Sequence, residues 1–163
     1  MSNICFYISL PQYLAQWFIN DQGGEYPVKL RRGSIEAKIV ETFVQTPPKN
    51  ESPVFSTDDD TAVLIPHFRG KDPVFYNYLS PIAKDAICET IRNRFDIELF
   101  NDLFSLPLIH NRIDMMLEAW MQCHGIEIND TNWNAVAKRY QRQRKAYRAT
   151  MRKRKERAKK SEK

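Results

Sequence analysis

The residues that could do chemistry are concentrated at the C-terminal end of the sequence, and they are positively charged. Residues 138–163 contain 14 Lys or Arg residues and two acidic residues, which gives a net charge of +12. The preceding 137 residues contain 11 basic and 18 acidic residues, so an acidic body is followed by a strongly basic end. Because clustered ammonium and guanidinium groups bind phosphates, this charge split indicates a polyanionic partner.

We expect the basic end to bind nucleic acid, with double-stranded DNA as the first choice, through phosphate contacts. Trp133, Tyr140 and Tyr147 recur every seven residues, which predicts one long helix with an apolar face that packs on the body. A helix over residues 132–160 would be about 43 Å long. After Met151 the only apolar residue is Ala158, so the last part of that helix has almost nothing to bury. The expected phosphate-contacting residues are Lys138, Arg139, Arg142, Arg144, Lys145, Arg148, Arg152 and Lys153.

The same segment allows two other interpretations. In the first, the protein is a protein–protein adaptor: the aromatic stripe docks a partner or a second copy of the chain, giving a homodimer through the helical half, and the basic tail only aids solubility. In the second, the tail covers the acidic body.

The charges of the tail also bear on its helical stability. Arg148/Arg152 and Lys153/Arg157 are like charges four residues apart. Such pairs destabilise an isolated helix, so the tail should fray unless phosphates neutralise it.

Part of the segment resembles a known DNA-binding motif. Asn134–Tyr140, with the sequence Asn-Ala-Val-Ala-Lys-Arg-Tyr, resembles the first helix of a bacterial helix-turn-helix. The resemblance implies that residues 144–154 form a recognition helix in the major groove. The intervening Gln141–Gln143 contains no Gly and no apolar residue to anchor a second helix, so one continuous helix fits the sequence better.

A broader resemblance extends over most of the chain. Three segments are similar to uncharacterised proteins of prophages and mobile elements in gut Bacteroidales: Phe95–Phe100, Trp120–Ile126 and Thr131–Arg142. The resemblance implies a setting, genetic mobility, in which DNA is a common partner. It implies no activity and no site residues.

A second group of polar residues follows a predicted buried strand. Arg69 and Lys71 could hold a phosphate, while His67 and Asp72 could serve as a general base and its orienting group. Gly70 alone does not make a phosphate-cradling loop, and no nucleophile with a paired base is present. We therefore expect a polar turn and no enzymatic activity, and we keep a phosphate-handling enzyme as a third possible function after DNA binding and the adaptor.

Metal and cofactor motifs are weak, so we expect neither. Asp58–Asp60 lacks the spaced ligands of a calcium loop, and the adjacent Cys123 and His124 lack a second pair of zinc ligands. The three cysteines form no CxxC pair, which favours reduced thiols in the cytoplasm. No apolar run reaches 18 residues and Met1–Leu10 has no basic start, so we expect neither a membrane span nor a signal peptide.

The sequence pattern predicts an α+β fold, in which strands of the first half and helices of the second half position these residues. In the first half, the periodicity predicts strands over 3–10, 26–30 and 61–66, a helix over 12–21, and a loop over 45–60. Ser34 is typical of a helix cap, although the alternation of Ile35, Ala37 and Ile39 leaves a strand open.

The second half is expected to be helical throughout. Ser80-Pro81 is a typical helix start, Asp96 would cap a second, shorter helix, and Pro107 would begin a third that ends at Gly125. The cap residues Asn129–Thr131 would start the last helix. We expect one globular domain over residues 1–147 and a basic C-terminal extension over residues 148–163.

Overall fold

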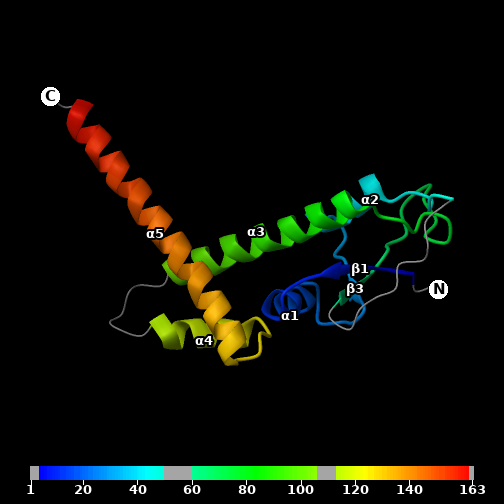
Figure 1. Cartoon of the computed structure of the whole chain (residues 1–163), viewed down its shortest axis with the longest axis horizontal. Helices are drawn as coiled ribbons and strands as arrows, with labels where there is room; N and C mark the ends of the chain where they lie inside the picture. The colour runs from blue at the N-terminus through cyan, green and yellow to red at the C-terminus, as the bar shows by residue number, and fades with distance from the viewer. Residues whose placement is uncertain (1–3, 50–59, 106–112, 162–163) are drawn as a thin grey trace.

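The structure, a computed structural model, is an α+β fold, as expected from the sequence (Figure 1). It describes residues 4–49, 60–105 and 113–161. The elements in chain order are β1 (Cys5–Ser9), α1 (Gln12–Asp21), β2 (Val28–Lys29), α2 (Ile35–Phe43), β3 (Asp60–Leu64), α3 (Pro81–Ser105), α4 (Ile113–Cys123) and α5 (Asp130–Ser161). None of the described helices combines the length and the apolar character that crossing a membrane requires.

The small sheet has the strand order β1-β3-β2, with β3 antiparallel to β1 and parallel to β2. Phe6 lies opposite Val63 in the register, and both side chains are buried. The expected strand over 26–30 is reduced to Val28–Lys29, because Tyr26 on its N-terminal side is exposed and only Val28 is buried. The sheet is therefore a short platform for the helices rather than a core of its own.

Helix starts follow the sequence signals. Ser34 Oγ accepts a hydrogen bond from the Ala37 N–H at 3.1 Å, which confirms the helix over the alternative strand. Ser80 Oγ accepts from the Ala83 N–H at 3.3 Å, and Asn129 Oδ1 accepts from the Asn132 N–H at 2.8 Å. These side chains satisfy N–H groups that have no partner within the first helical turn.

The predicted helix break at Asp96 is wrong. Helix α3 runs without interruption from Pro81 to Ser105 and contacts α1, α2, α4, α5 and β1 (Figure 1). Residues 82–105 contain no Gly or Pro that would break the helix. The Asp96 carboxylate binds Arg139 of α5 instead of capping a new helix. The start of a helix at Pro107 and most of the predicted loop over 45–60 lie outside the described residues.

The core is centred on Phe95, which is fully buried in the middle of α3. Its ring makes edge-to-face contacts with Tyr13 and Trp17 of α1, both at 5.4 Å between ring centroids, and with Trp120 of α4 at 5.5 Å. Such pairs stabilise by about 0.5–1.5 kcal/mol each beyond the burial of their surface. One side chain therefore joins three helices.

Replacing Phe95 by Ala should destabilise the fold by about 3–5 kcal/mol, because the cavity would remove the contacts among all three aromatic partners. Urea unfolding monitored by tryptophan fluorescence measures the change. Phe75→Ala is the matched control, since Phe75 is 65% exposed and should leave the free energy of unfolding nearly unchanged. Equal effects of the two substitutions would contradict this description of the core.

Candidate nucleic-acid interface

Helix α5 is attached to the body by the side chains of its first half. Val136, Ala137 and Tyr140 are buried and Trp133 is partly buried, and together they pack on α1, α3 and α4. Their spacing places them on one face of the helix. The apolar face predicted from the periodicity therefore packs on the body from Trp133 to Tyr140, as expected.

Arg139 holds α5 to the body electrostatically. Its guanidinium donates two hydrogen bonds to the Asp96 carboxylate, at 2.9 and 2.8 Å, and its Nε–H donates to the Tyr13 hydroxyl at 2.6 Å. Burial alone would lower the pKa of Arg139, but its interactions with Tyr13 and Asp96 outweigh burial and raise that pKa. Arg139 is thus a permanently charged clamp between α5, α3 and α1.

A second attachment lies about two turns further along α5. The Tyr147 ring packs edge-on against Phe104, with centroids 4.6 Å apart, and against Phe100 at 5.7 Å. Phe100 and Phe104 stack on each other at 5.0 Å near the C-terminal end of α3. With Arg139 this contact fixes the direction in which α5 leaves the body (Figure 1).

The face of α5 opposite these attachments is basic. At 100° per residue, Lys138, Arg142, Lys145, Arg152 and Lys153 fall within an arc of about 120° that is centred away from the packed face. All five are exposed, and we call them the basic stripe. The stripe extends along about 22 Å of helix axis. No Asp or Glu occurs between Asp130 and Glu156, so the stripe has no acidic neighbour on its own helix until Glu156.

The remaining predicted contact residues lie on the flanks of α5. Arg148 is exposed and Arg144 is half-buried, beside the packed face. Arg152 pairs with Glu156 at 3.8 Å, but both side chains are mostly exposed, at 77% and 64%, so the pair contributes little. Six of the eight predicted residues therefore lie along the exposed part of α5, whereas Arg144 is half-buried beside the packed face and Arg139 is engaged with Asp96.

No turn interrupts α5 between Asp130 and Ser161. Gln141–Gln143 is helical, so the two-helix arrangement implied by the helix-turn-helix resemblance does not form, and the single helix favoured by the sequence does. Any contact that α5 makes with a duplex must therefore come from the side of one continuous helix.

The loop over residues 67–72 has structural roles for two of its four polar residues. The Lys71 ammonium donates hydrogen bonds to the carbonyl oxygens of Glu41, Thr42 and Val44 at the C-terminal end of α2. Asp72 Oδ1 accepts a hydrogen bond from the Val74 N–H at 3.0 Å within its own turn. These bonds engage both groups in local structure and agree with the polar turn expected from the sequence.

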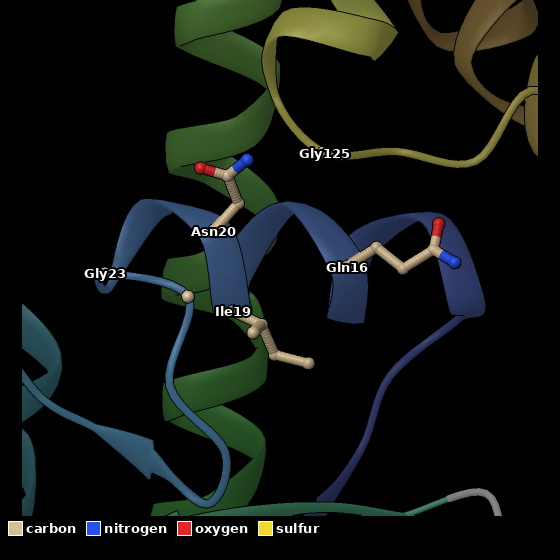
Figure 2. A pocket seen from close by; sticks show the side chains of 6 residues that line it. Gln16, Ile19, Asn20, Gly23 and Gly125 are labelled. Carbon is tan, nitrogen blue, oxygen red and sulfur yellow. The ribbon is translucent and has the colours of Figure 1, made fainter.

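Two surface hollows of the described structure lie outside the basic stripe. One is lined by Arg32, Lys38, His67 and Arg69 together with Glu41, and no residue of α5 borders it, so this basic spot is separate from the stripe. The other lies between α1 and the turn after α4 and is lined by Gln16, Ile19, Asn20 and Gly125, with the Asn20 side chain pointing toward the turn (Figure 2). Its lining has no charged or nucleophilic side chain. Asp58 and Asp59, of the expected weak metal motif, lie outside the described residues.

Gly125 is required where it stands. Its φ of +70° is a left-handed conformation that ends α4, and a Cβ at this position would collide with the Asn20 side chain (Figure 2). The close approach places the chain after α4 against α1, which orients the start of α5.

Comparison with protein-family models, curated proteins and solved structures gave no match.

Arg139→Gln should destabilise the protein by about 2–3 kcal/mol, because it leaves the partly buried Asp96 carboxylate without its cation. Arg142→Gln, three residues further along the exposed side, removes the same charge and should change the free energy of unfolding by less than about 0.5 kcal/mol. Chemical denaturation of both variants measures the difference. Equal stabilities of the two variants would show that Arg139 is not a clamp.

Proposed function

We propose that this protein binds double-stranded DNA through the phosphate backbone, using the basic stripe of α5 and the basic residues beyond it. The proposal rests on one observation: the first half of α5 packs on the body, whereas its basic end is exposed. Residues 133–147 include the attachments to the body, and after Met151 the described side chains of α5 are all exposed. A helix that projects from the body with this charge stabilises nothing inside the fold.

Electrostatics favours phosphate as the counter-charge. Along residues 148–157 the like charges four residues apart repel one another, which costs helix stability in isolation. Duplex DNA carries about one negative charge per 1.7 Å of axis, and cations that neutralise phosphates release condensed counterions. Binding therefore converts a destabilising repulsion into a favourable interaction, with no need for a base-specific contact.

We further propose that the protein is an accessory or regulatory factor of a mobile genetic element, as the resemblance of its sequence to prophage and mobile-element proteins implies. The thiols of Cys88 and Cys123 suit a reducing cytoplasm. The adaptor interpretation is retained as the alternative, because Phe104 and Ile97 are large apolar side chains exposed on α3.

The test is a fluorescence-anisotropy titration with a labelled duplex at several salt concentrations. If six phosphates are neutralised, log K should fall against log salt with a slope of about −5. The triple variant Arg142→Gln, Lys145→Gln, Lys153→Gln should lose about 0.9 of slope for each missing contact and bind all duplex sequences more weakly.

The matched control removes three charges from the body. Arg31→Gln, Arg32→Gln, Lys38→Gln changes the net charge by the same amount, at exposed positions in and just before α2. It should leave the salt slope within error of the wild type. Equal losses in the two triple variants would mean that only net charge matters, and the absence of binding at about 50 mM salt would favour the adaptor function.

A further inference from the structure

Three potential metal ligands meet between α3 and the end of α4, away from the basic stripe. Glu98 and Asp102 lie one helical turn apart on α3, and His124 directly follows α4. His124 Nε2 is 3.1 Å from Glu98 Oε1 and 3.9 Å from Asp102 Oδ2. The three ligand atoms lie within 4.8 Å of one another.

The orientation of His124 suits metal binding. Its Nδ1 lies 2.8 Å from the Trp120 carbonyl oxygen, which can only accept a hydrogen bond, so Nδ1 carries the proton. In the neutral ring Nε2 then holds the lone pair, and that lone pair faces the two carboxylates. The arrangement needs a positive charge between the three groups, which either a second proton on Nε2 or a metal cation can supply.

Trp120 holds two of the three ligands in place. Besides accepting from His124 Nδ1, it donates a hydrogen bond from its indole N–H to Asp102 Oδ2 at 2.9 Å. Its ring also stacks on the imidazole, with centroids 4.1 Å apart. Metal-binding histidines usually donate their other N–H to a carbonyl or carboxylate, which fixes the tautomer that the metal requires.

We propose that Glu98, Asp102 and His124 bind one divalent transition-metal ion of the zinc class. An imidazole nitrogen with two carboxylates suits zinc and its neighbours, whereas calcium prefers six to eight oxygen ligands. The side chains are 35%, 47% and 24% exposed, in the order Glu98, Asp102 and His124, so solvent can reach the ion. Three protein ligands leave a coordination position for water, and the ion joins α3 to the end of α4.

The test is isothermal titration of the full-length protein with zinc chloride at neutral pH. One zinc ion per chain should bind and should raise the thermal midpoint, since the ion stabilises the folded state that assembles its ligands. His124→Gln should weaken this binding by more than about tenfold, as should the milder Glu98→Gln, which keeps the imidazole–Trp120 stack. Because His124 must be deprotonated to bind the metal, the affinity should also fall as the solution is acidified.

His67→Gln is the matched control, because His67 is an exposed histidine that does not belong to the cluster. Zinc binding to this variant should equal that of the wild type. Titration with Co²⁺ gives a second measurement: a paramagnetic ion beside His124 should quench Trp120 emission in the wild type and in His67→Gln, but not in His124→Gln. Failure of the wild type to bind one zinc ion, or unchanged binding in His124→Gln, would overturn the proposal, and the cluster would then be a His124–Glu98 ion pair.

Discussion

Three consecutive residues of α3 hold the described structure together. Phe95 fills the centre of the core, and its neighbours Arg94 and Asp96 reach in different directions because successive residues of a helix are rotated by about 100°. Arg94 pairs with Asp21 at 2.8 Å and with the fully buried Glu36 at 2.7 Å, which joins α3 to α1 and α2. Asp96 pairs with Arg139 of α5. Because Phe95 also contacts Trp120 of α4, one helical turn thus contacts all four of the other described helices.

The charges in this turn are expensive to bury, so their pairing constrains the fold. Burial would by itself lower the pKa of Arg94, but Glu36 and Asp21 outweigh it and raise that pKa. A buried carboxylate such as Glu36 is tolerated only beside a cation, and removing the partner of such a group usually costs several kcal/mol. The same rule makes Arg139 unavailable to phosphate, although its neighbour Lys138 is free to reach solvent.

This constraint determines what α5 can do. The helix is held at Arg139 and again at Tyr147, so its direction is set by the body, and the residues beyond Met151 project from it (Figure 1). A projecting basic helix on a fixed base presents its charges in a defined line. That is the physical basis for the proposed contact with a duplex, and it differs from the contact of an unattached charged tail.

Local signals allowed much of the fold to be predicted from the sequence. The cap residues Ser34, Ser80 and Asn129, and the glycine at 125, gave helix ends that the structure confirms. The signal at Asp96 was misleading, since a carboxylate suited to a cap was used for an ion pair with a residue 43 positions away.

Long-range pairing also hid the roles of individual site residues. Arg139 has the same residue type as its basic neighbours, and only the packing of α5 on α3 shows that it is engaged. Likewise His124 had no visible ligand partner, because Glu98 and Asp102 come beside it only when α4 packs on α3. Periodicity indicates which face of a helix is buried, but not which charges will meet across an interface.

The most direct test of the central claim is hydrogen–deuterium exchange of the intact protein with and without duplex DNA at low salt. In the free protein, amides of residues 152–161 should exchange rapidly, because repelling like charges make this part of the helix open often. Binding to phosphates should slow exchange from about residue 142 to the end of α5, while β1 and β3 remain unchanged. Protection of the sheet or of α2 instead, with unchanged exchange in α5, would contradict the account.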